Sequence, residues 1–373
     1  MKETKLENIS KDSIFRRKWC ALASYQDRYI IIAGGKVDQN SCLTSAFIFD
    51  THSNTYKAFP DLPDEDYYDR GFGSHCVKYE FCSGAVLNDY FYLVARDYRM
   101  YRIRIIVEKE GSDVTGKMMK NEWETIENTD FLSKRMSSIV SDNKRLFLFC
   151  GGYLCSFDPD TNEWTKLSPI RTHKSRMFYA ITLCERKIFI IGGYVKKLTA
   201  ISSMEVYDID SMTWTDAPDL PVPLCDSSTC VLNRRWIVVT GGISLNRKAS
   251  KSFHIFDTYT QQWNPHISRK GVILPMGRMR HRAVALGESK VFFIGGNNMF
   301  GDILCLDCMR RRQLEIQSWY FVKDFILLRQ LVDNDRAFIQ SQNKIDHHDK
   351  SILVQMLMTN LDSDTFRHIL SFV

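Results

Sequence analysis

The placement of glycine constrains the fold of this chain more than any other feature. Ten of its 19 glycines fall in adjacent pairs, and each pair directly follows a short apolar run. The five runs are YIIIAGG, RLFLFCGG, KIFIIGG, WIVVTGG and VFFIGG, which end at Gly35, Gly152, Gly193, Gly242 and Gly296. Such runs are typical of buried strands followed by a turn that needs positive φ or a close backbone approach. Five copies indicate an internal repeat.

A second signal follows the glycine pairs. An aromatic residue precedes an aspartate in four copies, and another aromatic residue stands six positions after each aspartate. The aspartates are Asp50, Asp158, Asp208 and Asp257, and the later aromatic residues are Tyr56, Trp164, Trp214 and Trp263. The polar segments between them predict hairpin turns, so we expect the aspartates to stabilise turns rather than to form a catalytic ring of carboxylates. Each Trp is expected to pack where neighbouring repeats meet.

This pattern resembles the kelch repeat. The glycine pair, the aromatic-Asp step and the Trp of the last strand carry the resemblance, which covers roughly residues 2–313. A further strand should precede each glycine strand, at 20–24, 76–80, 137–141, 179–183, 229–233 and 283–287. The second copy is degenerate, because Ala95-Arg96 replaces the glycine pair. The resemblance implies an all-β fold, a six-bladed kelch-type β-propeller, which we expect to carry a C-terminal α-helical extension.

The expected blades cover residues 18–59, 75–127, 136–168, 177–217, 227–266 and 282–313. A propeller must also close its ring so that no sheet edge is left open. Thr4-Lys5-Leu6 repeats the sequence Thr165-Lys166-Leu167, which directly follows Trp164. We therefore expect residues 2–8 to add the outer strand of the sixth blade, so that the propeller domain spans 1–313. The alternative closing strand is QLEI at 313–316.

Residues 314–373 lack the repeat, and their apolar stretches predict a helical tail. The segment LDSDTFRHILSFV (361–373) also resembles the opening helix of an F-box. That resemblance implies a ubiquitin-ligase subunit as a partner, since F-boxes couple substrate-binding propellers to ubiquitin ligases. The alternative is an amphipathic helix that packs on the propeller.

Composition narrows the class of protein. A net charge of +6 is too small to argue for nucleic acid, and no run of 18 apolar residues predicts a membrane span. The N-terminus lacks a secretory signal, so the eleven Cys are expected to be free thiols in the cytoplasm or the nucleus. Neither the lone Cys305–Cys308 pair nor His347-His348 predicts a metal site. Common nucleotide-binding and hydrolase motifs are missing, so we expect no enzyme, no catalytic residue and no cofactor.

Basic residues concentrate in the loops that, by resemblance to kelch proteins, form the ligand-binding face. The loops after the glycine strands contain Lys36, Arg96, Arg99, Lys196, Lys197, Arg247, Lys248 and Lys251, against Asp38, Asp97 and Asp302. An Arg also stands close to the first strand of several copies. We expect Arg17, Arg135, Arg176 and Arg282 to converge on one basin, with Lys196, Lys197 and Arg247 on its rim. Arginine suits such a basin because its planar fork binds carboxylates and phosphates.

The sequence therefore predicts a protein–protein interaction module, an adaptor or scaffold that binds an acidic segment of a partner protein. Two alternatives stay open. Some propellers are enzymes, so a carbohydrate-acting or oxidase-like propeller is the first. Nucleic-acid binding through the same basic face is the second, and it is disfavoured because the loops offer few aromatic side chains for base stacking.

Overall fold

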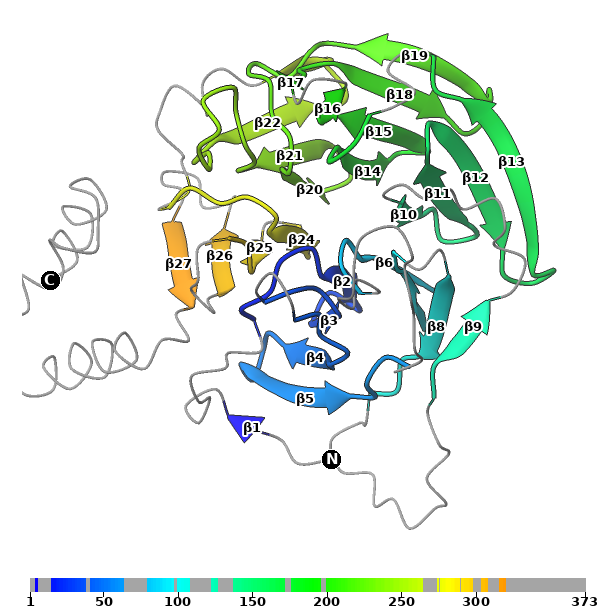
Figure 1. Ribbon diagram of the computed structural model, residues 1–373, viewed down its shortest axis with the longest axis vertical. Helices are drawn as coiled ribbons and strands as arrows, with labels where there is room; N and C mark the ends of the chain where they lie inside the picture. The colour runs from blue at the N-terminus through cyan, green and yellow to red at the C-terminus, as the bar shows by residue number, and fades with distance from the viewer. Residues whose placement is uncertain are drawn as a thin grey trace, which may run out of the picture.

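The computed structural model describes residues 4–5, 15–37, 41–63, 79–96, 99–107, 122–126, 137–171, 176–195, 199–263, 274, 276–288, 290–297, 303–307 and 315–319. Within these ranges every regular element is a β-strand, and six sheets of four or five strands surround a common axis (Figure 1). The expected all-β propeller is thereby confirmed. In the described part of the chain, no helix is long and apolar enough to cross a bilayer.

We number the sheets in chain order. Sheet 1 contains β1 (Thr4–Lys5), β2 (Ala21–Tyr25), β3 (Tyr29–Ala33), β4 (Ala46–Asp50) and β5 (Thr55–Phe59), in the spatial order β1-β5-β4-β3-β2. Sheet 2 contains β6 (Ser83–Leu87), β7 (Tyr90–Val94), β8 (Met100–Arg104) and β9 (Glu124–Ile126). Sheet 3 contains β10 (Ser137–Ser141), β11 (Leu146–Cys150), β12 (Tyr153–Asp158) and β13 (Glu163–Pro169).

Sheet 4 contains β14 (Ala180–Cys184), β15 (Lys187–Ile191), β18 (Met204–Asp208) and β19 (Thr213–Ala217). A small ribbon of β16 (Tyr194–Val195) and β17 (Thr199–Ala200) lies in the connection between β15 and β18. Sheet 5 contains β20 (Ser228–Leu232), β21 (Trp236–Thr240), β22 (Phe253–Asp257) and β23 (Gln262–Trp263). Sheet 6 contains β24 (Arg282–Leu286), β25 (Lys290–Ile294), β26 (Ile303–Asp307) and β27 (Glu315–Trp319).

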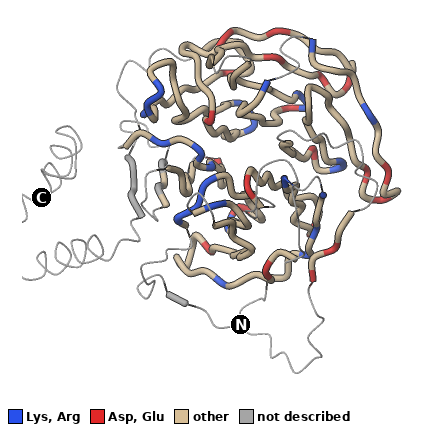
Figure 2. Tube along the Cα trace, viewed as in Figure 1, with Lys and Arg blue, Asp and Glu red and all other residues tan. Residues whose placement is uncertain are grey.

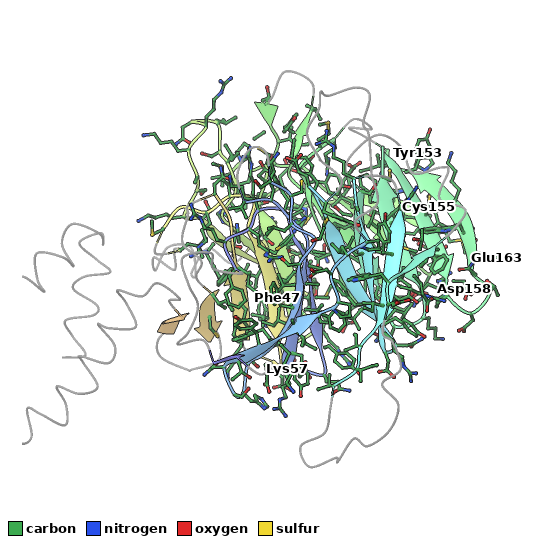
Figure 3. The ribbon with its side chains drawn as sticks, turned by 60° about the horizontal axis from the view of Figure 1, so that its bottom comes forward. Phe47, Lys57, Tyr153, Cys155, Asp158 and Glu163 are labelled. Carbon is green, nitrogen blue, oxygen red and sulfur yellow. The ribbon has the colours of Figure 1, made fainter. Side chains whose placement is uncertain are left out.

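The aspartates of the repeat stabilise hairpin turns, as the sequence predicts. The Oδ1 atom of Asp208 accepts hydrogen bonds from the backbone N–H groups of Asp210 (3.0 Å) and Ser211 (2.9 Å). The same bond to the residue two positions ahead is made by Asp50, Asp158 and Asp257. Figure 3 shows Asp158 beside Glu163 at one end of sheet 3, where β12 turns into β13. Local polar chemistry therefore fixes the outer hairpins.

The hydrophobic core is divided among the spaces between neighbouring sheets. Each of the six clusters of buried apolar side chains joins two adjacent sheets, and the cluster between sheets 6 and 1 joins the two ends of the ring. The repeat Trp residues lie at these boundaries. Trp214 and Trp263, and also Trp123 just before β9, each donate an indole N–H to a carbonyl in or directly after the last strand of the preceding sheet, on Ser168 (3.2 Å), Pro218 (2.9 Å) and Pro60 (2.8 Å). The expected packing of Trp between repeats is confirmed.

The innermost strands form a closed circle of contacts in the order β2, β6, β10, β14, β20, β24 and back to β2. Serines at the starts of two of these strands link them to the next sheet. Ser83 accepts a hydrogen bond from the N–H of Ile139 (3.1 Å), and Ser228 accepts one from the N–H of Ala283 (2.7 Å). These strands therefore line the axis of the propeller.

The expectation that residues 2–8 close the sixth blade is wrong. β1 pairs with β5 at the outer edge of sheet 1, with Thr4 opposite Tyr56. The outer strand of sheet 6 is β27, which pairs with β26 over five residue pairs and overlaps the alternative segment QLEI. A strand that follows β26 directly needs only a short connection, so it closes a smaller loop than one from the other end of the chain.

Two further expectations fail. The first strand of sheet 2 is β6 rather than 76–80, because β6 reaches β7 through the two-residue turn Asn88-Asp89, and Asn88 tolerates positive φ (54°). The tail does not begin as a helix at 314, because Glu315–Trp319 is a strand. Residues 320–373, with the expected helices and the F-box-like segment, lie outside the described residues.

The glycine pairs are needed for close backbone approach, and Gly241 gives the clearest test. Gly241 has φ of 59°, and a Cβ there would overlap the carbonyl oxygen of Arg278. We expect Gly241→Ala to lower the unfolding free energy by about 2–4 kcal/mol, from left-handed backbone strain and displacement of the Arg278 loop. Gly287 is the matched control, since it has φ of 60° and no atom lies within 4 Å of the place that an added Cβ would occupy. Gly287→Ala should cost only about 1–2 kcal/mol. Equal losses in urea denaturation would show that the close approach is unimportant.

Candidate functional site

One end of the ring gathers two kinds of loop, and we call this end the mouth. In sheet 1 the first residue of β2, Ala21, lies opposite the last residue of β3, Ala33. The loop that leads into the first strand therefore emerges beside the loop that follows the second strand. The same pairing recurs in sheet 5, between Ser228 and Thr240. This geometry places the loops expected to bind ligands together at the mouth.

Five residues occupy one special position at the mouth, two residues before the first strand of their sheets. They are Trp19, Phe81, Phe178, Asp226 and Arg280, and all five have positive φ between 52° and 63°. Their backbones connect the sheets to each other. The N–H of Trp19 donates to the carbonyl of Arg280 (3.0 Å), Arg280 donates to Asp226 (3.0 Å), and Asp226 donates to Phe178 (2.9 Å). The unusual backbone conformation thus builds a chain of hydrogen bonds across the mouth.

The aromatic members of this set meet each other although they come from sheets 1, 2 and 4. The ring centroids of Trp19 and Phe81 are 4.2 Å apart, those of Phe81 and Phe178 are 5.4 Å apart, and those of Trp19 and Phe178 are 6.5 Å apart. Tyr194 stacks on Phe178 at 5.1 Å. Because sheets 1 and 4 are not neighbours, these contacts must cross the axis. Trp19, Phe81 and Phe178 therefore form an aromatic plug.

An ion pair between a buried carboxylate, Asp226, and a half-exposed guanidinium, Arg280, holds one side of the plug. Asp226 accepts a hydrogen bond from the indole N–H of Trp19 (3.1 Å) and another from Nε of Arg280 (3.1 Å). The guanidinium of Arg280 also lies 4.3 Å above the Trp19 ring. Burial raises the pKa of Asp226, whereas Arg280 acts in the opposite direction. Arg280 remains half-exposed, so it presents positive charge at the mouth.

A second buried carboxylate, Glu80, is shared by two cations. Its Oε1 accepts a hydrogen bond from Lys36 (3.2 Å) and its Oε2 accepts one from Arg96 (2.8 Å). The guanidinium of Arg96 lies 5.4 Å from the centre of the Phe81 ring. Two cations therefore share one carboxylate beside the aromatic plug. Elsewhere, basic and acidic positions are spread around the whole ring (Figure 2).

Two of the arginines expected in the basin are structural instead. Arg17 is buried, and its guanidinium donates to the carbonyls of Gly34 (2.9 Å) and Ser45 (3.0 Å) in its own sheet. Arg176 is also buried and pairs with Glu205 (3.0 Å). Burial lowers the pKa of Arg17 to about 10 and lowers that of Arg176. The expectation that both reach a common basin is wrong, because both guanidiniums are buried and donate to acceptors within their own sheets.

The remaining predicted residues have different locations. Arg282 extends along the axis, where it donates to the carbonyls of Cys20 (2.9 Å) and Cys82 (2.7 Å). Arg247 is exposed on the loop after β21, next to the exposed Leu245 and Lys248. Arg135, Lys196 and Lys197 lie outside the described residues. Of the predicted set, only Arg247 is an exposed cation at the mouth among the residues that the structure describes.

Sequence reasoning missed the residues that build the mouth. Trp19, Phe81, Phe178, Asp226 and Arg280 differ in chemistry, so no motif connects them. The feature that they share in the sequence is their position, two residues before the first strand of each sheet. Glu80 could not be recognised, because its partners Lys36 and Arg96 come from the loops of two different sheets.

The arrangement of the mouth is suited to binding. Half-exposed aromatic rings of Phe81, Phe178 and Tyr194 lie beside the cations Arg96 and Arg280. Such a surface can bind a carboxylate through charge-assisted hydrogen bonds and an apolar side chain through ring contacts. In the described ranges, no group of three or more His, Cys, Asp or Glu side chains gathers at metal-binding distance.

Comparison with known proteins agrees with the kelch-repeat pattern of the sequence. The family model of the KLHDC2/KLHL20/DRC7 Kelch-repeats domain matches residues 112–310, more than half of the chain. Acyl-CoA-binding domain-containing protein 4 of Arabidopsis thaliana is 27% identical over 149 residues, which cover 39% of this chain and 22% of that protein. Kelch-like protein 36 of Mus musculus is 23% identical over 238 residues, which cover 58% of this chain and 36% of that protein. The chain thus matches only about a fifth to a third of these relatives' length.

A solved structure agrees in fold. The structure titled "Structure of YjhT" superimposes with a TM-score of 0.61 and covers 81% of this chain and 97% of that one. The two sequences are only 13% identical, so this likeness concerns the fold alone.

Proposed function

Because the chain belongs to the kelch-repeat family, we propose that it is a protein-interaction module whose mouth binds an acidic segment of a partner protein. The observation that carries the proposal is the cluster of three cations, Lys36, Arg96 and Arg280, on the carboxylates of Glu80 and Asp226, directly beside half-exposed aromatic rings. An acidic peptide with one apolar side chain would neutralise these cations and cover the rings. The protein would then act as an adaptor or scaffold in the cytoplasm or nucleus.

Arg96 offers the sharpest test of this proposal. We expect Arg96→Ala to weaken binding of an acidic peptide by about 10-fold to 100-fold, since a hydrogen bond to a charged group contributes roughly 1.5–3 kcal/mol. Glu80 keeps its bond to Lys36 in this variant, so the fold should persist. The probe is a peptide selected from a random displayed library against the wild-type chain, synthesised with a fluorophore. Its affinity is measured by fluorescence anisotropy beside a melting curve.

Two controls make the result interpretable. A copy of the peptide with Asn and Gln in place of Asp and Glu should bind poorly to the wild type. Lys144→Glu changes an exposed cation of the β10–β11 turn, at the opposite end of the ring, and should leave the affinity unchanged.

A further variant changes two exposed cations of the loop after β21. Arg247→Glu with Lys248→Glu should mainly slow association of the peptide and reduce the salt dependence of its association rate. Selection of peptides without acidic residues, or equal weakening by Lys144→Glu, would contradict the proposal.

The two alternative functions predict other outcomes. A carbohydrate-acting or oxidase-like propeller would turn over sugars or alcohols, whereas we propose a non-enzymatic role. A nucleic-acid-binding protein would bind a random single-stranded oligonucleotide, and log affinity would fall steeply with log salt concentration. The proposed module should do neither under conditions in which the acidic peptide binds.

We also propose that the six sheets constitute all the blades of the ring. The circle of inner strands and the six shared hydrophobic clusters support this blade count. A ubiquitin-ligase subunit as a partner of the tail stays a prediction. Its test is affinity purification from cells with two chains, one that ends at 373 and one that ends at 319. The shorter chain keeps β27 in sheet 6 and lacks the rest of the tail, so only the longer chain should recover the subunit.

A further inference from the structure

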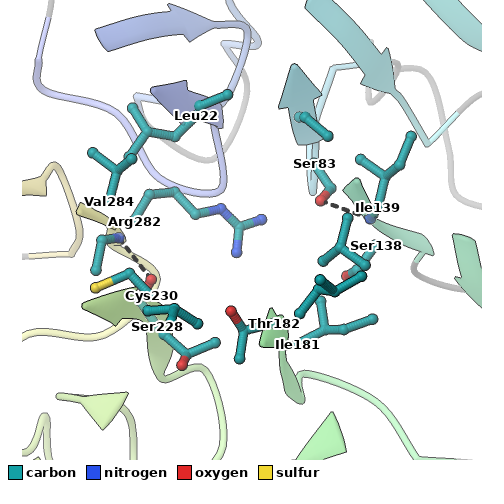
Figure 4. Close-up of a pocket in the computed structure, with 18 of the residues that line it drawn as sticks. Leu22, Ser83, Ser138, Ile139, Ile181, Thr182, Ser228, Cys230, Arg282 and Val284 are labelled. Atoms are coloured by element: carbon teal, nitrogen blue, oxygen red, sulfur yellow. Dashed lines mark hydrogen bonds between the residues drawn. The ribbon is translucent and has the colours of Figure 1, made fainter. Parts of the chain in front are cut away.

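A cavity of about 420 Å³ runs along the axis of the propeller. All six innermost strands line it, with Ser83, Ser138, Thr182 and Ser228 among the lining residues (Figure 4). Its volume falls within the range of small-molecule sites in proteins. The lining begins just beyond the aromatic plug and continues to Asn143 in the β10–β11 turn. The plug thus separates the cavity from the mouth, and the cavity faces the opposite end of the ring.

Arg282 is the one charged residue among the described residues that line the cavity. Figure 4 shows its guanidinium extending from β24 into the open space. Nε and Nη2 donate to the carbonyls of Cys20 and Cys82, whereas Nη1 has no acceptor within the described part of the chain. The nearby carboxylate of Asp226 is already bonded to Trp19 and Arg280. Arg282 therefore presents positive charge and unused N–H donors to the cavity.

Hydroxyl groups surround the same space. Ser83 and Ser228 each accept a backbone N–H with their oxygen, so their own O–H groups are left to donate. Both serines line the cavity together with Arg282. Their hydroxyls can therefore donate to an anionic group that Arg282 binds.

Toward its other end, the cavity is lined by aliphatic side chains from five different sheets, alongside the polar residues Ser24, Ser141 and Asn143. The aliphatic residues are Val86, Val140, Leu183, Val231 and Ala285. An anion with a short aliphatic tail therefore fits both Arg282 and these side chains.

From this juxtaposition we propose that the axial cavity binds a small monocarboxylic acid, with its carboxylate on Arg282 and its tail between the aliphatic side chains. The site is distinct from the peptide-binding mouth, so the test of ligand binding in the cavity is independent of the test of the proposed function.

The test uses hexanoate as the probe and isothermal titration calorimetry on the full chain. We expect saturable binding of hexanoate and no binding of hexanamide, which has the same tail without the charge. Ala285→Leu should weaken hexanoate at least about tenfold, the factor that corresponds to roughly two methylene groups excluded from the tail site. This variant leaves Arg282 and its carbonyl partners unchanged. Because Ala285 also packs against the hydrophobic cluster between sheets 5 and 6, a melting curve checks that the variant is folded under the conditions of the titration.

Arg282→Gln should also abolish binding, but it removes bonds to Cys20 and Cys82 and can destabilise the fold. The conclusion therefore rests on Ala285→Leu. Arg247→Glu with Lys248→Glu should bind hexanoate normally, which separates this site from the mouth. Equal binding of hexanamide and hexanoate, or unchanged binding by Ala285→Leu, would overturn the proposal.

Discussion

Replacement of Arg176 by alanine should lower the unfolding free energy by about 3–5 kcal/mol. The Arg176 and Glu205 side chains are 0% and 2% exposed, and their charged atoms are 3.0 Å apart. Arg176 also donates to the carbonyl of Ile190 (3.1 Å) and to Ser203 Oγ (2.7 Å). Without Arg176, the buried carboxylate of Glu205 would lose the guanidinium that bonds its Oε2. The sequence alone predicts a different role for Arg176, since from it we expect Arg135→Ala combined with Arg176→Ala to abolish partner binding and to leave thermal stability nearly unchanged.

A matched pair of variants tests this explanation by urea denaturation. Arg171→Ala removes an ion pair with Asp216 whose side chains are 57% and 65% exposed, and it should cost less than about 1 kcal/mol. Arg176→Met combined with Glu205→Leu should recover most of the stability, because the buried charge is then removed with its partner. A loss below about 1 kcal/mol for Arg176→Ala would show that Arg176 does not stabilise Glu205.

Removal of β27 should destabilise the propeller far more than removal of β1. β27 pairs with β26 over five residue pairs, whereas β1 pairs with β5 over two. At roughly 1 kcal/mol for each hydrogen bond, a chain that ends at 314 should lose about 5 kcal/mol, and deletion of residues 1–8 should lose about 2 kcal/mol. Without β27, the exposed edge of β26 also favours aggregation.

The control is a chain that ends at 319, which keeps β27 and lacks only the residues after it. Melting curves of the three truncated chains should place the one that ends at 314 clearly below the other two. If deletion of residues 1–8 were the most damaging change, the N-terminal segment would close the ring after all.

Local regularities made much of the fold predictable. The glycine pairs, the aspartate turns and the Trp positions each depend on residues close in sequence or on a contact that every repeat makes in the same way. Asp208 stabilises its turn through Asp210 and Ser211, which are its near neighbours. Repetition of such local signals was sufficient to predict strands, hairpins and an all-β propeller.

The candidate site was not predictable in the same way, because its contacts join residues far apart in the chain. Arg282 and Cys20, which meet at the axis, are separated by 262 positions. The sequence could show that Arg17, Arg176 and Arg282 stand near first strands, but not which acceptors surround each guanidinium. Packing between sheets decided that Arg17 and Arg176 are buried and that Arg282 extends into a cavity.

By itself, therefore, the sequence determined the repeat, its strands and its turns, since short-range hydrogen bonds and hydrophobic patterns encode them. Only the tertiary structure decided which strand completes sheet 6, which arginines are structural, and how Trp19, Phe81 and Phe178 meet across the axis. These outcomes depend on ring closure, which brings six sheets to one axis and creates contacts that no single repeat contains.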